Sequence, residues 1–312
     1  MGAPVFGTLG ALFGLFVWWA RSANDVRLPP LSHPAPPLTN IARSYIKPSA
    51  FHGEEVRSRV DPLTNLTRRG DLPYFEGWYI KVTDDSGKTT AFIPGAFYGS
   101  KEATAFVLTL EDNGRATKFS YPLTDFRAEE VSDRFEVSVG PNTFSSQGMH
   151  VSLPEVAEGS LSFQGATPWP VTLLEPGVMG WFAWLPWMEC RHGVPSLAHR
   201  VEGKLSTRRG AVQTFSSTPG YIEKDRGRQF PSHWIWIQSN AFPDSEQDVS
   251  LTGSIARIPY LGFSFPGHVS KRKPRSKCKF IQKTSPHPSP PVQLTPLLVL
   301  VRFHTCTCRS LG

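Results

Sequence analysis

The sequence predicts an all-β protein with a barrel or sandwich architecture, and three observations favour this class. Short alternating or β-branched runs, such as Phe75 to Thr83, recur roughly every ten to fifteen residues. Turn-forming residues separate them, most clearly Asp84-Asp85-Ser86-Gly87 and Asp112-Asn113-Gly114. No long segment has the 3.6-residue apolar period of an amphipathic helix. We therefore expect many short antiparallel strands.

The predicted strands form two groups, in residues 74–170 and 199–268. The first group comprises Phe75–Thr83, Thr89–Tyr98, Thr104–Glu111, Thr117–Leu123, Phe135–Val139, Met149–Leu153 and Leu161–Gln164. The second comprises Val201–Ser206, Ala211–Ser216, Trp234–Asn240, Val249–Ile258 and the run around Phe263–Phe265. About five strands are fewer than the roughly eight of a small closed barrel, so the second domain is expected to be incomplete. Residues 171–198, an irregular aromatic segment, are interpreted as a linker or lid between the two domains.

The N-terminal region predicts attachment to a membrane. Residues 1–20 carry no charged side chain, and the first base, Arg21, follows the run. Its uncharged stretch is marginal for a bilayer core of about 30 Å, and an anchor is slightly favoured over a cleaved signal. Residues 21–73 are rich in proline and are interpreted as a linker. A plastid and a secretory location both stay open, and Asn65-Leu66-Thr67 is a glycosylation sequon that adds little.

Charge is distributed unevenly along the 312 residues, whose net charge is +7. Residues 269–312 contain nine of the 33 bases and none of the 26 acids, which leaves 24 bases against 26 acids elsewhere. A nearly neutral body argues against nucleic acid as a partner. Residues 269–312 are expected to form a basic, disordered tail, and the abrupt change in composition also fits an altered reading frame.

Most common catalytic motifs are absent from the sequence. Three of the four cysteines lie in the tail, and the spacings predict neither a disulfide framework nor a zinc site. Cys190, His192 and His199 are conceivable as a nucleophile with bases or as metal ligands, but their irregular setting favours neither. No metal site is therefore predicted.

The segment from Gly220 to Asn240 combines acids with aromatic residues and is the main functional clue. Glu223 and Asp225 lie in an expected turn before a strand. Because side chains alternate along a strand, Trp234, Trp236 and Gln238 share one face, and Ile235, Ile237 and Ser239 share the other. Indoles beside carboxyl groups suit an apolar ligand that must receive a proton, although ordinary barrel filling explains them equally.

Three motifs in this order resemble the tocopherol cyclase-like family. They are Phe75-Glu76-Gly77-Trp78-Tyr79, Trp187-Met188-Glu189-Cys190-Arg191-His192-Gly193, and the block from Gly220 to Asn240. The resemblance covers roughly residues 73–268 of this chain. It implies two tandem lipocalin-like antiparallel β-barrels, of which the second lacks its closing strands here.

The resemblance also implies an activity. The family's reaction is an isomerisation in vitamin E biosynthesis, the acid-catalysed closure of a prenylated hydroquinone to a chromanol. Protonation and ring closure are redox-neutral, so no cofactor is implied. The expected partner is a hydrophobic prenylquinol or isoprenoid ligand. The alternative is a lipocalin-like protein that binds a lipid or isoprenoid without catalysis, and a membrane or protein adaptor is a third class.

The same resemblance assigns the candidate site residues. Glu223 is the leading proton donor, Glu76 is the second, and Asp225 would hold Glu223 protonated by like-charge repulsion. For Glu76 the alternative is a strand-end carboxylate bonded to backbone amides or an arginine, and for Glu223 it is a salt bridge to Lys224 or a nearby arginine. Tyr221 is a candidate to hold the quinol oxygen. The candidates for an indole wall, or otherwise for core filling, are Trp78, Trp181, Trp234 and Trp236.

One position departs from the family pattern. Arg226 stands where the family usually has tryptophan, within Glu223-Lys224-Asp225-Arg226-Gly227. A guanidinium beside the site would repel a carbocation, and an ion pair with Glu223 would keep that carboxyl ionised. The sequence therefore weakens the case for cyclase chemistry at this point.

Overall fold

The structure is a computed structural model that describes residues 73–99, 103–131, 134–171, 177–185, 188–207, 210–228, 230–240, 249–260 and 263–273. Strands dominate these ranges, with two short 3-10 helices, so the all-β prediction is confirmed. None of the helices in the described ranges is long and apolar enough to cross a membrane. The predicted anchor, nearly all of the proline-rich linker and the tail beyond residue 273 lie outside the described residues.

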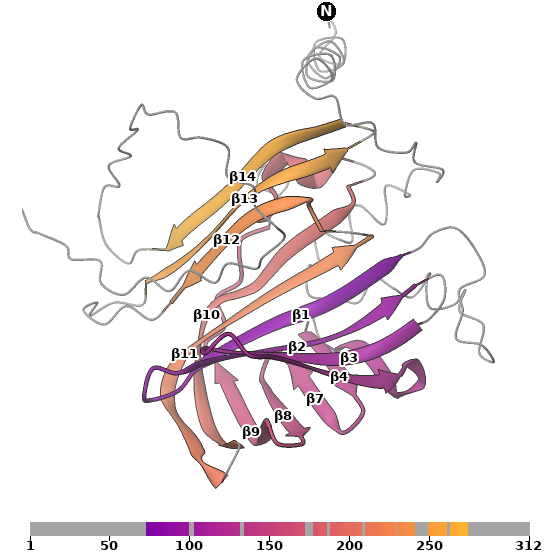
Figure 1. The fold of residues 1–312 in the computed structure, drawn as a ribbon. Helices are drawn as coiled ribbons and strands as arrows, with labels where there is room; N and C mark the ends of the chain where they lie inside the picture. Colours follow the sequence, from indigo (N-terminus) through magenta and orange to yellow (C-terminus); the bar gives the residue numbers. More distant parts are fainter. Residues whose placement is uncertain are drawn as a thin grey trace, which may run out of the picture.

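Eleven strands form one antiparallel sheet, in the order β4-β3-β2-β1-β11-β10-β9-β8-β7-β6-β5. They are β1 (Tyr74–Thr83), β2 (Thr89–Tyr98), β3 (Ala103–Glu111), β4 (Ala116–Pro122), β5 (Phe126–Val131), β6 (Arg134–Val139), β7 (Asn142–Ser145), β8 (Gly148–Leu153), β9 (Ala157–Gln164), β10 (Cys190–Thr207) and β11 (Val212–Gly227). The short helix η1 (Leu123–Asp125) joins β4 to β5. This sheet curls into a nearly closed barrel (Figure 1).

Side-chain contacts join strands of the barrel that are not hydrogen-bonded neighbours. Trp78 of β1 stacks on Phe135 of β6 across the barrel core, with 5.8 Å between ring centroids. Asn142 of β7 donates to the Tyr121 hydroxyl of the edge strand β4 at 3.1 Å. Side-chain packing therefore holds the two halves of the curled sheet together.

Three further strands form a second, smaller sheet in the order β12-β13-β14. These strands are β12 (His233–Ser239), β13 (Ser250–Tyr260) and β14 (Phe263–Lys273), and the sheet lies above the upper ends of β10 and β11 (Figure 1). Hydrogen bonds attach it to the larger sheet, two of them to backbone carbonyls. Ser250 donates to the Leu197 carbonyl at 2.7 Å, and Asn240 donates to the Gly220 carbonyl at 2.7 Å.

The structure confirms most predicted strands and corrects four details. Residues 220–227, expected as a turn, continue β11, because acidic and basic side chains alternate there and both faces are covered. The strands β5 and β7 were missed, since one is highly charged and the other has only four residues. Strands β10 and β11 pair with the first group, and β14 extends past the predicted start of the tail.

A charged pair is buried inside the barrel. The Lys224 side chain is 1% exposed and the Glu76 side chain 0% exposed, and their Nζ and Oε1 atoms are in contact. Tyr74 donates to the other Glu76 oxygen at 2.7 Å, and the Lys224 ammonium lies 4.6 Å from the centre of the Trp78 ring. These contacts compensate two charges that would otherwise be costly to bury.

Removing one partner of this pair should destabilise the barrel strongly. We expect Glu76→Ala to lower the free energy of unfolding by about 3–5 kcal/mol, because Lys224 is left buried without its carboxylate. Urea denaturation followed by tryptophan fluorescence measures this loss. The double variant Glu76→Leu with Lys224→Met should recover most of it, and a double variant as unstable as Glu76→Ala would contradict the account.

His199 makes the stability of the protein sensitive to acid. It is 3% exposed, and its Nδ1 lies 3.0 Å from the Ser196 hydroxyl. Burial lowers the pKa of His199 to about 4. In the unfolded chain His199 is protonated near pH 6.5, whereas in the native state it stays neutral down to about pH 4. The free energy of unfolding therefore falls as the pH drops from about 6.5 towards 4.

A glutamine at position 199 should reduce this acid sensitivity. We expect His199→Gln to remove up to about 3 kcal/mol of the stability lost between pH 6.5 and 4, since the uncharged amide has no proton to gain. Urea midpoints across this pH range provide the measurement. The exposed His150, replaced by Gln, serves as the control, and equal slopes for both variants would refute the assignment.

Candidate active site

A cavity of about 410 Å³ lies between the larger sheet and the three-stranded sheet. Strands β1, β2 and β3 form one wall, β12 and β13 form the facing wall, and the helix η2 (Gly180–Trp184) contributes Phe182. The lining is mainly apolar and comprises Phe75, Gly77, Tyr79, Ile93, Phe106, Leu108, Leu110, Met179, Phe182, Met188, Cys190, Phe230, Pro231, Trp234, Trp236, Ala256, Ile258, Pro259 and Gly267. The polar lining residues are Glu189, His192, Glu223, Asp225, Ser254 and His268.

Alternation along β11 sends its charged side chains to opposite sides of the sheet. Glu223 and Asp225 line the cavity. Ile222 belongs to the barrel core, and Lys224 reaches the barrel carboxylate of Glu76. The neighbouring residues Glu223 and Lys224 therefore face different spaces, the cavity and the barrel interior.

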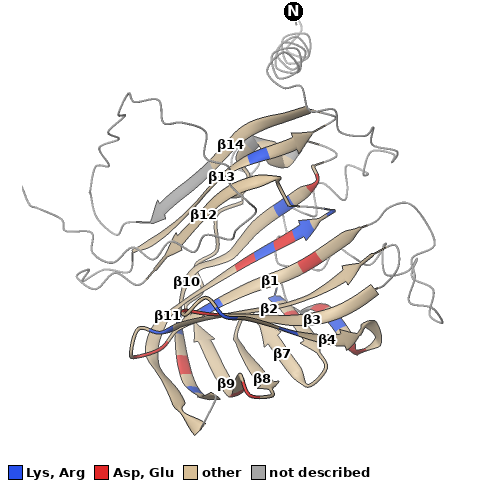
Figure 2. Cartoon of the chain, viewed as in Figure 1, with Lys and Arg blue, Asp and Glu red and all other residues tan. Residues whose placement is uncertain are grey.

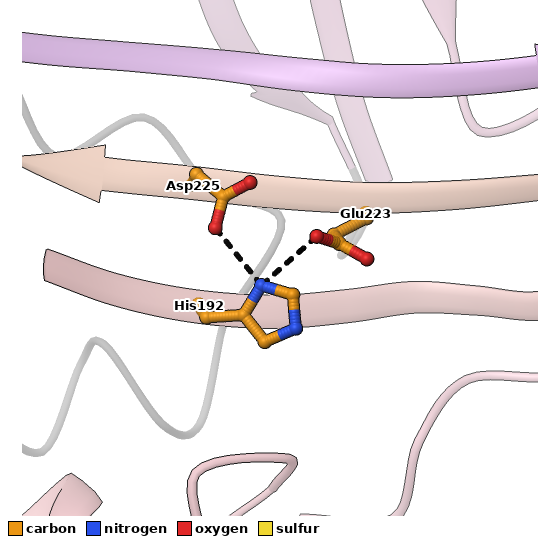
Figure 3. Close-up of side chains that lie close together, drawn as sticks. All are labelled: His192, Glu223 and Asp225. Carbon is orange, nitrogen blue, oxygen red and sulfur yellow. Dashed lines mark hydrogen bonds and ion pairs between the residues drawn. The ribbon is translucent and has the colours of Figure 1, made fainter. Parts of the chain in front are cut away.

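His192 of β10 joins the two acids of β11 (Figure 3). Its backbone is paired with Asp225 across the sheet. The His192 Nδ1 atom lies 2.9 Å from Asp225 Oδ1 and 3.1 Å from Glu223 Oε1. One imidazole nitrogen thus contacts both carboxyl groups, which a single N–H group can hold by a shared hydrogen bond.

The second oxygen of Glu223 is held by two donors. The Tyr221 hydroxyl donates to Glu223 Oε2 at 2.5 Å, and the Trp236 indole N–H donates to the same atom at 3.2 Å. Tyr221 is 0% exposed and also lies 3.2 Å from the Thr252 hydroxyl. The carboxyl group is therefore fixed on one side and points its other oxygen towards His192.

Burial dominates the electrostatics of Glu223. Desolvation raises the pKa of this carboxyl to about 7, the His192 charge opposes that rise, and the Asp225 charge adds to it. Burial lowers the pKa of His192, but the charges of Glu223 and Asp225 outweigh this effect and raise it to about 9. Near neutral pH, His192 is protonated and Glu223 exchanges its proton. The cluster can both donate and accept protons in a largely apolar space.

The structure brings together four of the eight predicted site residues around one carboxyl group. Tyr221 and Trp236 hydrogen-bond to Glu223, and Asp225 reaches it through His192. Trp234 lines the cavity as well. The tyrosine at position 79, which was not predicted, packs edge-on against Trp236 with centroids 5.3 Å apart.

Three other predicted residues lie elsewhere or are not described. Glu76 and Trp78 project into the barrel on the opposite face of β1 from the cavity residues Phe75 and Tyr79. Glu76 has a structural role there, as its alternative interpretation held, but its partner is Lys224 and not an arginine. Trp181 belongs to η2, and its side chain lies outside the described residues.

Arg226 lies on the opposite face of β11 from Glu223, with which the sequence suggested a pairing. It is two residues from Lys224 on the barrel side, where its charge and a hydrogen bond act on Tyr74. The pKa of Glu223 is shifted by burial, by the charges of His192 and Asp225, and by hydrogen bonds from Tyr221 and Trp236. The charge of Arg226 opposes the rise in the pKa of the cavity residue Cys190.

His192 is the functional residue whose role the sequence did not reveal. It was considered only with Cys190 and His199, in a segment without a clear pattern. The structure extends β10 back to Cys190 and thereby aligns His192 with Asp225. One ligand atom from each of His192, Glu223 and Asp225 lies within 4.8 Å of the others, close enough to hold a metal ion. The shared hydrogen bonds already account for this arrangement.

Comparisons with known proteins agree with the motif resemblance. The family described as tocopherol cyclase-like matches residues 147–262. A chloroplastic tocopherol cyclase of Zea mays is 36% identical over 75 residues, which are 24% of this chain and 16% of that protein. A probable chloroplastic tocopherol cyclase of Oryza sativa subsp. japonica is 33% identical over 90 residues, 27% of this chain and 18% of that protein. The chain thus matches less than a fifth of the length of these relatives.

Among solved structures, kievitone hydratase from Nectria haematococca is similar at 12% sequence identity, with a TM-score of 0.37. The match covers 71% of this chain and 65% of that one.

Proposed function

From the tocopherol cyclase-like family to which residues 147–262 are matched, we propose that this protein is an isomerase that closes a prenylated hydroquinone to a chromanol by acid catalysis. The observation that carries the proposal is the Glu223 carboxyl group, 5% exposed in the cavity wall, whose pKa burial raises to about 7. Such a group keeps a transferable proton at neutral pH, when an ordinary glutamate has lost it.

The proposed reaction moves one proton in and one proton out. The Glu223 O–H group transfers its proton to one carbon of the trisubstituted alkene nearest the ring, which leaves a tertiary cation on the other carbon. The phenol oxygen forms the new C–O bond, and its O–H proton passes to the Glu223 carboxylate. His192 stabilises the charge on that carboxyl while it is ionised, and Asp225 holds His192 in place. Product and substrate have the same composition, as an isomerase requires.

The cavity walls support the cationic intermediate. Tyr79, Trp234 and Trp236 line the cavity, and their ring faces stabilise a nearby cation by up to about 2 kcal/mol when water is excluded. The apolar lining also limits access of water, which would otherwise capture the cation as a tertiary alcohol. These walls fit a hydrophobic prenylquinol and the non-catalytic binding of an isoprenoid equally, so the proton donor must be tested directly.

Replacing Glu223 should abolish ring closure while binding persists. We expect Glu223→Gln to lower kcat at least about 100-fold, because the amide cannot deliver the proton, with a small change in affinity for the prenylated benzoquinol. Product formation is followed by chromatography and binding by tryptophan fluorescence. Glu189→Gln, which changes another cavity residue, is the matched control. Binding without ring closure in the unaltered protein and both variants would support a lipid carrier and reject the enzyme.

The indole N–H of Trp236 should set the alkaline limit of the reaction. Its hydrogen bond favours the ionised form of Glu223 and lowers the pKa of that group. The rate should fall as the pH rises through about 7, because the acid form is lost. Trp236→Phe should move this limit to higher pH, since the stabilising donor is gone. Profiles of kcat against pH measure the shift.

Trp234 provides the control for this measurement. It lines the same cavity without a hydrogen bond to Glu223 in the part of the chain that the structure describes. Trp234→Phe should therefore leave the position of the alkaline limit unchanged. An equal shift in both variants would indicate a general effect of cavity polarity instead of the specific hydrogen bond.

A further inference from the structure

The outer face of the three-stranded sheet exposes aliphatic side chains to solvent. Ile235 of β12 is 47% exposed and Ile255 of β13 is 60% exposed, and the two residues are paired across the strands. The half-buried Ile237 and Leu251 have the same parity on these strands and so lie on this face too. The opposite face carries Trp234 and Trp236. An exposed apolar pair at the centre of a sheet face indicates a contact surface.

The described strands of this sheet carry no acidic residue, since none of the sequences of β12, β13 and β14 contains Asp or Glu. Figure 2 shows a basic band and no acidic band on the described part of this sheet. Strand pairing places Arg257 opposite His233 and beside the isoleucines, and both residues are exposed. An apolar centre beside an exposed guanidinium is complementary to an interface of acyl chains and anionic headgroups.

The same sheet connects the outer surface with the cavity. Phe230, just before β12, is 46% exposed and also lines the cavity. Its ring stacks on Phe75 with centroids 4.6 Å apart and on Trp234 with centroids 5.7 Å apart. An apolar path of aromatic rings therefore runs from the exterior near β12 to the cavity wall.

We propose that the outer face of β12–β13–β14 docks on the surface of a membrane containing anionic lipids, with Ile235 and Ile255 inserted among the headgroups. Docking brings the Phe230 side of the cavity close to the bilayer, where a ligand that fits an apolar cavity is dissolved. The role of this contact in ligand uptake rests on the proposed function, whereas the docking itself does not.

Vesicle binding tests the proposal on the full chain. The protein is sedimented with phosphatidylcholine vesicles, either pure or containing about a third phosphatidylglycerol. Phosphatidylglycerol should increase the amount of bound protein. We expect the double variant Ile235→Glu with Ile255→Glu to reduce this increase at least about tenfold. The control is Val212→Glu, because Val212 is 58% exposed but belongs to β11, outside this sheet. Equal binding by the double variant and the unaltered protein would overturn the proposal.

A second measurement locates the contact and remains valid if another segment also binds lipid. Tryptophan is introduced at position 255 or, as the control, at position 212, and quenching by brominated phospholipid is compared with that of the unaltered protein. The proposal requires additional quenching at position 255 only. No additional quenching at position 255, or equal quenching at positions 255 and 212, would overturn it. Self-association of the protein through Ile255 in the absence of lipid would also overturn it. Ring closure is assayed in detergent and does not depend on either result. Failure of the proposed function can therefore be distinguished from failure of membrane docking.

Discussion

The alternation of side chains along β11 is the constraint on which the rest of the structure depends. This strand separates a packed barrel from a cavity, and each successive residue must satisfy a different environment. Glu223 faces the cavity and keeps a proton because water is scarce there. Lys224 faces the barrel and remains charged beside Glu76. A slip of one residue in register would exchange these two environments and bury both charges wrongly.

The acid chemistry of the site arises from competition among several modest effects. Desolvation favours the neutral carboxyl of Glu223, while the imidazolium of His192 and two hydrogen bonds favour its anion. The pKa of Glu223 lies near 7 because these opposing effects nearly balance. A carboxyl group poised in this way can release a proton to a weakly basic alkene carbon and then exist as an anion without leaving the apolar cavity. In the proposed reaction its neighbours would thus contribute to both proton transfers.

The sequence predicted most strands of the first barrel, since period-two patterns and turn residues are local signals. It could not reveal that β10 and β11 belong to the first barrel, because pairing with β1 and β9 depends on contacts between distant segments. The same limitation hid His192, whose importance comes from its register opposite Asp225. Arg226 was weighed as a departure from the family motif. Only the strand conformation of β11 shows that its side chain lies on the opposite face from Glu223.

The length of β10 and β11 has a consequence for how the molecule responds to occupancy of its cavity. These strands have 18 and 16 residues, and each continues from the cavity wall into the barrel. A molecule that holds their upper ends together also restrains the ladder farther down, since the backbone is continuous and its hydrogen bonds open cooperatively. Binding of a ligand in the cavity therefore slows amide hydrogen exchange at the far end of the barrel, in strands that do not contact the ligand.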